Sequence, residues 1–309
     1  MIELRRLRRH FGPTRAVDDV SFAVHPGQVF GYIGPNGAGK TTSMRILATL
    51  DLPTAGDALI DGFSVVDDPD RVRRRLGFMP DYFTTYANVN VLEYLDFFAR
   101  AYQLRGAARA DAVQRVMRFT GLDVLAEKSI DGLSKGMKQR LCLGRALIHD
   151  PAVLVLDEPA AGLDPRARIE LREMIRALAN AGKTILISSH ILTELAAICD
   201  VVGILERGRL LAVGSVEEIQ RQCRQPHQWV EVRLVDGVQA LGQWLAGQPS
   251  VSQLQVNGEA VRFAFEGDGK SQAALLRAIL GAGFEVVAFG AEQQTLEDAF
   301  MQITQGLVQ

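Results

Sequence analysis

The sequence predicts an α/β fold with a larger N-terminal domain and a small α+β domain at the C-terminal end. Three observations predict this fold class. A glycine-rich turn at 34–41 stands between an apolar run and a helical stretch, in the order strand, loop, helix. Two short apolar runs, 153–156 and 184–187, enclose a helical segment at 167–179, as in a parallel βαβ unit. From about residue 229 the expected strands and helices follow a different order.

The first part of the chain predicts an antiparallel β subdomain followed by helices. Over 2–33 apolar and polar side chains alternate in short runs separated by Gly-Pro and Pro-Gly pairs. The run 29–33 is expected to be a buried strand, and a helix is expected over about 40–50. From 89 to 125 apolar residues recur with a helical period, and we expect a helical insert over about 82–140.

A polar segment around 221–228, which contains Pro226, predicts the domain boundary. We therefore expect one domain at 1–225 and a second at 226–309. The second is expected to read strand, helix, strand, strand, helix, strand, with a final helix from about Thr295, which is the ferredoxin-like, split βαβ pattern. Acidic residues outnumber Lys and Arg by nine to four in it, so the two parts differ in charge.

The composition is that of a globular protein with a net charge close to zero. The 309 residues are 48% hydrophobic and 23% charged, with a formal net charge of −2. That balance gives no support for binding nucleic acid through electrostatics, and we expect no nucleic-acid partner. The three cysteines are too widely spaced for a disulfide framework or a zinc cluster. No apolar stretch reaches the roughly 18 residues that a membrane span needs, so we expect a cytoplasmic protein.

The turn at 34–41 fits the pattern G-x-x-x-x-G-K-[ST] in the strand–loop–helix context that this pattern requires. Its glycines let consecutive backbone N–H groups point at phosphate oxygens, helped by the helix dipole. Lys40 is expected to reach the β- and γ-phosphates, and Thr41 to offer a hydroxyl to Mg²⁺. The candidate nucleotide-binding residues of this segment are Gly34, Pro35, Asn36, Gly37, Ala38, Gly39, Lys40, Thr41 and Thr42.

Two acidic residues follow the apolar run 153–156. Asp157 stands where a strand would deliver a carboxylate to a metal, directly or through water. Glu158 is then placed to polarise the attacking water. These residues thus predict a bound nucleoside triphosphate together with Mg²⁺.

With these motifs in place, the chain resembles the ATP-binding subunits of ABC transporters. The loop at 34–41 resembles the Walker A motif of the family, and 153–158 resembles Walker B with its catalytic glutamate. About 90 residues after the loop, Leu-Ser-Lys-Gly-Met at 133–137 resembles the signature LSGGQ. The resemblance implies that Ser134 and Gly136 contact the γ-phosphate of ATP held by another subunit. It therefore implies a homodimer or a paired ATPase subunit.

Further residues match the family in order along the chain. Residues 161–164 resemble the D-loop, which couples the two ATP sites. His190, after a predicted strand, resembles the switch histidine that contacts the γ-phosphate; considered alone, it would more often be a structural histidine. Phe11 stands where the family stacks an aromatic ring on adenine, or it packs on its own domain.

Two places depart from the family pattern. Asp81 stands near the position where the family usually has a glutamine that helps to hold Mg²⁺, so Asp81 is a third candidate metal ligand whose role stays open. In the signature, Lys135 replaces a glycine and Met137 a glutamine. The added charge of Lys135 either strengthens phosphate binding or points to solvent.

The C-terminal part resembles the small domain found on ATPases of type 2 ABC exporters, including its closing segment 296–300. Such subunits pair with a transmembrane permease on a separate chain, which places them peripherally at the cytoplasmic face of the membrane. Tyr82, Phe83 and Tyr86 stand where a permease would dock by this resemblance, or they belong to the core.

The function expected from the sequence is an ATPase motor: two chains clamp two Mg·ATP, and hydrolysis drives the permease, most simply for export. One alternative is an ATP-dependent dimerising regulator with weak hydrolysis, which the departures at 81, 135 and 137 leave open. The other alternative is a non-transport ABC ATPase. Such proteins commonly carry two nucleotide modules or a long coiled coil, and this chain contains neither.

Overall fold

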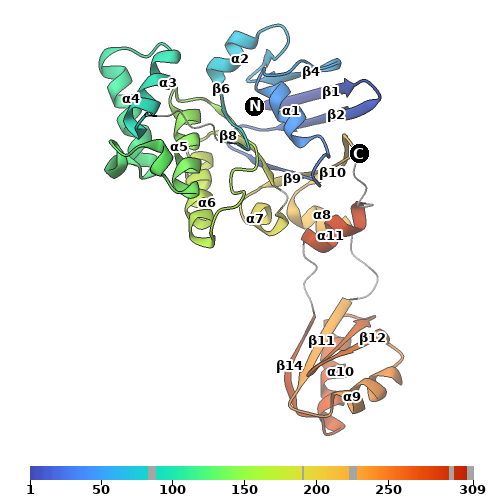
Figure 1. Ribbon diagram of the computed structural model, residues 1–309. Coiled ribbons are helices and arrows are strands. Elements are labelled where there is room, and N and C mark those ends of the chain that lie inside the picture. The colour runs from blue at the N-terminus through green and yellow to red at the C-terminus, as the bar shows by residue number, and fades with distance from the viewer. Residues whose placement is uncertain (83–87, 190, 223–227, 292–295, 305–309) are drawn as a thin grey trace. The chain divides into compact units, whose positions relative to one another are not determined.

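The structure of the protein is a computed structural model that describes residues 1–82, 88–189, 191–222, 228–291 and 296–304. The chain forms two compact units (Figure 1). The larger comprises Met1–Ile219 and Phe300–Gln309, and the smaller comprises Gln220–Ala299. The chain thus leaves the larger unit near the predicted boundary and returns to it at the C-terminal end. The sequence-based division at 225 and 226 did not include that return.

An antiparallel four-stranded sheet begins the larger unit, in the strand order β2-β1-β4-β5. Its strands are β1 (Ile2–Phe11), β2 (Thr14–Val24), β4 (Ala55–Ile60) and β5 (Phe63–Ser64). Register shifts between Leu4 and His10 interrupt the β1–β2 ladder. The side chains that face inward, such as Ile2, Val20 and Ile60, are fully buried. This sheet is the predicted antiparallel β subdomain.

A six-stranded sheet follows, in the order β10-β9-β3-β8-β7-β6, and all its pairs except β10–β9 are parallel. Its strands are β3 (Val29–Ile33), β6 (Leu76–Met79), β7 (Val153–Leu156), β8 (Thr184–Ser189), β9 (Val201–Glu206) and β10 (Arg209–Gly214). Because both faces of such a sheet are covered, β3, β7 and β8 are apolar and buried almost throughout. The predicted α/β fold is confirmed.

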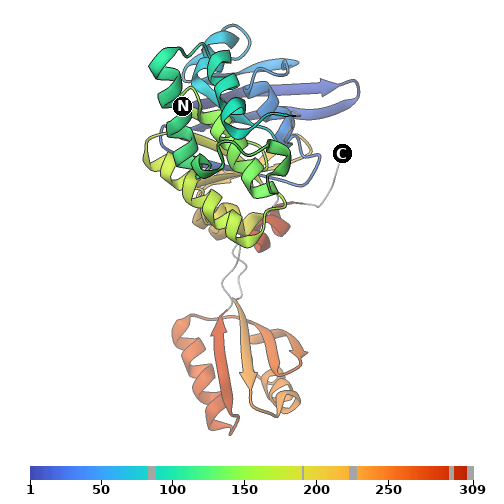
Figure 2. The ribbon, with the colours of Figure 1, turned by 60° about the vertical axis from the view of Figure 1, so that its left-hand side comes forward.

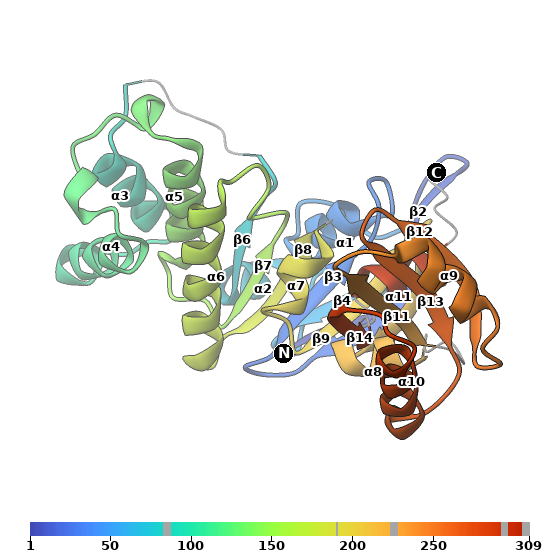
Figure 3. The ribbon, with the colours of Figure 1, turned by 90° about the horizontal axis from the view of Figure 1, so that it is seen from below.

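Helices surround this sheet and form a separate group beyond β6. The helices of the larger unit are α1 (Lys40–Leu47), α2 (Pro69–Arg75), α3 (Val91–Ala101), α4 (Gly106–Thr120), α5 (Lys135–Leu147), α6 (Pro165–Asn180) and α7 (Leu192–Ala196), with short 3₁₀ turns at Asp123–Leu125 and Ile130–Gly132. Figure 3 shows α3, α4 and α5 side by side. The predicted insert over 82–140 corresponds to these three helices, but α5 continues to Leu147 because its buried face extends that far.

The smaller unit has an antiparallel sheet in the order β12-β13-β11-β14, which is the split βαβ order that the sequence predicts. Its elements are β11 (Gln228–Leu234), α9 (Val238–Ala246), β12 (Val251–Asn257), β13 (Ala260–Phe265), α10 (Gly269–Gly281) and β14 (Val286–Ala291). Figure 2 shows both helices beside the sheet. They share one core with β11 and β13, in which Leu241 and Ile279 are fully buried.

Two helices lie where the chain passes from one unit to the other: α8 (Val216–Gln222) and α11 (Leu296–Ile303). The predicted final helix corresponds to α11. Cys142 and Cys199 are free and buried, as expected of small apolar residues, and Cys223 lies outside the described residues. No helix among the described residues has the length and apolarity that crossing a membrane requires.

Candidate nucleotide-binding site

The glycine-rich turn between β3 and α1 is so closely packed that two of its positions admit only glycine. A Cβ atom on Gly34 would lie 2.3 Å from the Leu205 carbonyl oxygen, and one on Gly39 would lie 2.1 Å from that of Ala16. Gly39 also has φ +104°, a conformation that side chains disfavour. No side chain caps α1 at Gly39 in the described structure. The N–H groups of the first turn are therefore available to an anion.

Lys40 begins α1 and points back into this turn. Its Nζ donates hydrogen bonds to the carbonyl oxygens of Gly34, at 2.6 Å, and Pro35, at 3.2 Å. It also lies 3.8 Å from Oε1 of Glu158. Burial lowers the pKa of Lys40, and the carboxylates of Glu158 and Asp157 offset part of this shift. The ammonium group is thus held inside the turn that the phosphates would enter.

Asp157 follows the buried strand β7 and is completely buried. Its N–H donates to the Met79 carbonyl at 2.8 Å, and its Oδ1 accepts a hydrogen bond from the Ser188 hydroxyl at 2.6 Å. Its Oδ2 is buried without a hydrogen-bond partner among the described residues. Burial raises the pKa of Asp157, hydrogen bonding by the Ser188 and Thr41 side chains offsets part of this rise, and the negative charges of Asp81 and Glu158 add to it. A cation bound to Oδ2 would stabilise the ionised form of Asp157 and so counteract the raised pKa.

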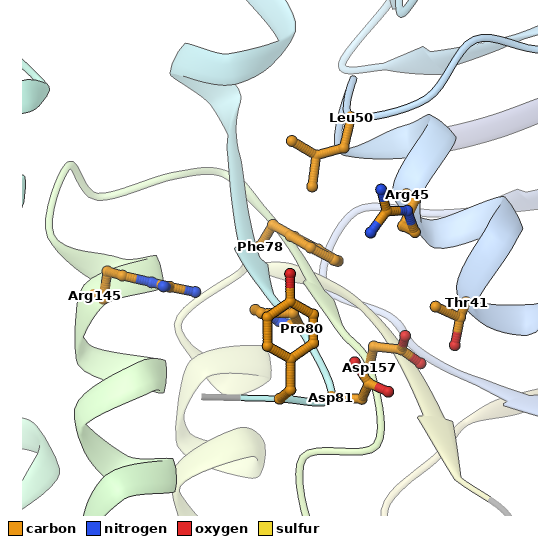
Figure 4. A pocket seen from close by; sticks show the side chains of 9 residues that line it. Thr41, Arg45, Leu50, Phe78, Pro80, Asp81, Arg145 and Asp157 are labelled. Carbon is orange, nitrogen blue, oxygen red and sulfur yellow. The ribbon is translucent and has the colours of Figure 1, made fainter. Parts of the chain in front are cut away.

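A cavity of about 240 Å³ brings the three candidate metal ligands together. Figure 4 shows the Asp81 and Asp157 carboxylates beside one another, with Thr41 next to them. The other residues that line the cavity are Arg45, Leu50, Phe78, Pro80, Tyr82 and Arg145. Carboxylate and hydroxyl oxygens are the ligands that Mg²⁺ prefers, usually together with phosphate oxygens. The residues present therefore fit Mg²⁺.

Glu158 has a strained backbone, with φ +47° in the left-handed region. Its N–H donates to the Ser188 hydroxyl at 2.8 Å. Ser188 is not among the site residues predicted from the sequence. The signal that could have found it is the parallel pairing of β7 with β8, which sets Leu156 opposite Ile187. That register brings the next residues, Asp157 and Ser188, to the same end of the sheet.

The predicted adenine-stacking residue, Phe11, ends β1 with 48% of its surface exposed. The Arg9 guanidinium lies 4.3 Å from the centre of its ring and forms an ion pair with Asp51 at 2.8 Å. A guanidinium over an aromatic face is a favourable contact. One face of the Phe11 ring is thus occupied from within the chain.

The signature residues lie at the start of α5, and neither Ser134 nor Gly136 lines the cavity. The Ser134 hydroxyl caps the helix by accepting a hydrogen bond from the N–H of Met137 at 3.3 Å. The side chain of Lys135 lies against Gly162 of the predicted D-loop, since a Cβ atom on Gly162 would come within 4 Å of its Nζ, Cε and Cδ. Lys135 is an exposed residue whose side chain reaches the predicted D-loop of its own chain.

Three of the candidate functional residues lie outside the described residues: His190, Phe83 and Tyr86. Tyr82, the third aromatic of the expected docking segment, is 61% exposed and lines the cavity.

Comparison with protein families identifies both units. The profile described as "ABC transporter" matches residues 17–161. The profile described as "ATP-binding protein DrrA1-3-like, C-terminal domain" matches residues 214–304. The expected resemblance to type 2 exporter ATPases is therefore confirmed for both parts of the chain.

Individual relatives agree with this. The chain is 33% identical over 310 residues to the Nod factor export ATP-binding protein I of Cupriavidus metallidurans, covering 98% of this chain and 97% of that protein. It is 38% identical over 228 residues to the probable multidrug ABC transporter ATP-binding protein YbhF of Escherichia coli. That match covers 74% of this chain but only 39% of YbhF, so the chain spans well under half of that relative's length.

Solved structures show the same fold. An ATP-binding subunit of an ABC transporter superposes with a TM-score of 0.66 at 32% identity, covering 72% of this chain and 92% of that one. The bacterial cassette MJ0796, solved as a dimer, gives a TM-score of 0.63 at 24% identity and covers 70% of this chain and 98% of that one. With glycines shaping the turn around Lys40 and two acidic residues at the end of β7, these matches establish that the chain belongs to the ATP-binding proteins of ABC transporters and is an ATPase of that family.

Proposed function

We propose that the chain is the ATP-hydrolysing motor subunit of an ABC exporter, in which two copies close around two Mg·ATP. The observation that carries the proposal is that the side chains of Lys40, Asp157 and Glu158 lie close together. A buried ammonium, a buried carboxylate and a second carboxylate 3.8 Å from the ammonium lie at one end of the sheet, and one oxygen of the buried carboxylate has no hydrogen-bond partner in the described part of the chain. This is the charge arrangement that phosphoryl transfer to water requires.

In this proposal each residue of the site has its own role in ATP hydrolysis. Lys40 exchanges its hydrogen bonds to the Gly34 and Pro35 carbonyls for hydrogen bonds to phosphate oxygens. The N–H groups of the turn and of the first turn of α1 hold the remaining phosphate oxygens. Thr41 and Asp157 would hold Mg²⁺, which offsets the negative charge of the phosphates, with Asp81 as an additional ligand. Glu158 orients the attacking water.

Dimerisation is proposed because the chain carries one phosphate-binding turn and one signature. Ser134 is exposed at the N-terminus of α5, where its hydroxyl is accessible to ATP on a second chain. His190, by its resemblance to the switch histidine, completes this shared site. The identical chain is the proposed second subunit, and a paired ATPase subunit of similar sequence would serve in the same way.

A separate membrane permease is the proposed partner. Two relatives carry the names Nod factor export ATP-binding protein and probable multidrug ABC transporter ATP-binding protein. An ATPase that drives such export works at the cytoplasmic face of the membrane, and we propose a peripheral location there. The formal net charge of −2 gives no support for a nucleic-acid partner, and we propose none.

Turnover measurements on the purified chain test this function. We expect Mg²⁺-dependent release of phosphate from ATP that Glu158→Gln abolishes, and faster release when the permease that co-purifies with the chain is present. ATP binding without turnover, both alone and with the permease, would instead favour the weakly hydrolysing regulator. Co-purification with no membrane protein would favour a non-transport ABC ATPase.

A further inference from the structure

The hydroxyl of Ser188 joins the two acidic residues of the site. It donates a hydrogen bond to Asp157 Oδ1 at 2.6 Å and accepts one from the N–H of Glu158 at 2.8 Å. Ser188 lies in β8 and is completely buried. A hydroxyl has only one hydrogen to donate. That hydrogen is donated to the carboxylate of Asp157, and a lone pair of the hydroxyl oxygen accepts the hydrogen bond from the N–H of Glu158.

The first hydrogen bond determines which oxygen of Asp157 is left for a cation. With Oδ1 held by Ser188, Oδ2 is the buried oxygen without a partner among the described residues. Asp157 lines the cavity together with Thr41 and Asp81. A carboxylate that turned freely would divide its time between orientations, whereas a hydrogen bond at one oxygen fixes the other.

The second hydrogen bond supports an unfavourable backbone conformation. Glu158 has φ +47°, which is uncommon for a residue with a side chain and persists only when its surroundings enforce it. The parallel ladder between β7 and β8 reaches its last pair at Leu156 and Ile187. Beyond that pair, the N–H of Glu158 bonds to the side chain of Ser188 and not to its backbone.

We propose that Ser188 is a positioning residue of the ATPase: its single hydroxyl orients the metal-binding carboxylate of Asp157 and holds the backbone turn that carries Glu158. This inference rests on the proposed function of the site. Ser188 touches neither ATP nor water in this role and acts only through its two neighbours. Removing the hydroxyl should therefore weaken two properties together, the effect of magnesium on ATP binding and the rate of turnover.

The test compares four proteins: the parent, Ser188→Ala, Ser188→Thr and Thr120→Val. Thr120 is the matched control, because its hydroxyl is equally buried and donates to the Val116 carbonyl at 2.9 Å within α4. For each protein, ATP affinity is measured with a fluorescent ATP analogue in EDTA and in Mg²⁺, and turnover is measured at saturating ATP. Thermal melting confirms that each protein is folded.

In Ser188→Ala we expect the ATP affinity in EDTA to stay within about twofold of the parent. The gain, meaning the increase in ATP affinity that Mg²⁺ produces, should be reduced about tenfold or more, and kcat should fall by a similar factor. Thr120→Val should retain both the gain and the turnover. Ser188→Thr keeps the hydroxyl and should retain the gain from Mg²⁺ within about threefold.

A folded Ser188→Ala that retains the Mg²⁺ gain or the turnover of the parent would overturn the positioning role, and so would a folded Ser188→Thr that loses the gain. A parent that binds ATP no better with Mg²⁺ would overturn the proposed function as well. The two failures are therefore distinguishable.

Discussion

Nζ of Lys40 lies 3.8 Å from Oε1 of Glu158, so the ammonium that is to bind phosphate faces the carboxylate that is to orient water. In this arrangement the positive charge is shared between Glu158 and the carbonyl oxygens of the turn. An entering triphosphate competes for the same ammonium. The contact thus links the phosphate-binding turn, through Lys40, to the acidic residues after β7, through Glu158, before any nucleotide is bound.

Replacing Lys40 with Ala removes the ammonium group from this arrangement. We expect ATP affinity to fall about ten- to a hundredfold, the scale of a lost charge-assisted hydrogen bond, and turnover to be abolished. Nucleotide titration and a phosphate-release assay measure both effects. Lys270→Ala, at an exposed position in α10, is the control and should behave as the parent. Turnover retained by the Lys40 variant would refute the phosphate-binding role.

Asp81 gives a second prediction, because it lines the cavity with Thr41 and Asp157 and its charge contributes to the raised pKa of Asp157. If its carboxylate helps to hold Mg²⁺, Asp81→Gln should preserve or improve turnover by supplying the usual residue of the family. Asp81→Ala should lower turnover by about a hundredfold, with partial recovery at high Mg²⁺. Both variants within a few-fold of the parent at all Mg²⁺ concentrations would show that Asp81 is not a ligand.

His149 predicts a pH dependence of stability. Its ring stacks on Tyr102 at 3.7 Å, and Nε2 lies 3.1 Å from the Leu76 carbonyl oxygen. Burial lowers the pKa of His149 to about 4, so between pH 4 and about 6.5 the unfolded chain binds a proton that the folded chain does not. Stability is therefore fully present above pH 6.5 and falls as the pH decreases.

At pH 5.5 the loss attributable to His149 should be about 1 kcal/mol. Denaturant unfolding at pH 7.5 and 5.5 measures it, and His149→Gln should lose that part of the pH dependence. His25→Gln, at an exposed position, should retain the full dependence. An unchanged dependence in His149→Gln would contradict the assignment.

The sequence predicted those parts of the fold that depend on local pattern. The run 29–33, the turn and α1 were identified because a buried strand, glycines and a helical period follow one another within twenty residues. Ser188 was missed because its role depends on β7 and β8 being neighbours, which no local pattern reveals. The end of α5 at Leu147 was missed because its last turns are fixed by burial against neighbouring elements.

The return of the chain to the larger unit is also a non-local feature, and it leads to a prediction about truncation. Among the described residues, the hydrophobic cores of the two units have no member in common, so truncation after residue 225 should leave a folded ATP-binding domain. That truncation also removes Phe300–Gln309, which groups with the larger unit and includes the buried Thr304.

A variant in which a Gly-Ser linker replaces 228–291 keeps that segment and should melt at a higher temperature than the truncated chain. Calorimetry of the two proteins measures the difference. Equal melting temperatures would show that the C-terminal segment does not stabilise the larger unit. Failure of both proteins to fold would show that the smaller unit is required.

The most direct test of the proposed ATP-dependent dimer is the mass of Glu158→Gln in solution. Glutamine keeps the size of the side chain but lacks the carboxylate that orients water, so ATP should bind without being hydrolysed. Light scattering on this variant should give about 34 kDa without nucleotide and about twice that mass with Mg·ATP. Glu158→Gln combined with Ser134→Arg should remain monomeric, because the arginine obstructs the shared site. A Glu158→Gln protein that binds Mg·ATP and still has the mass of one chain would contradict the account.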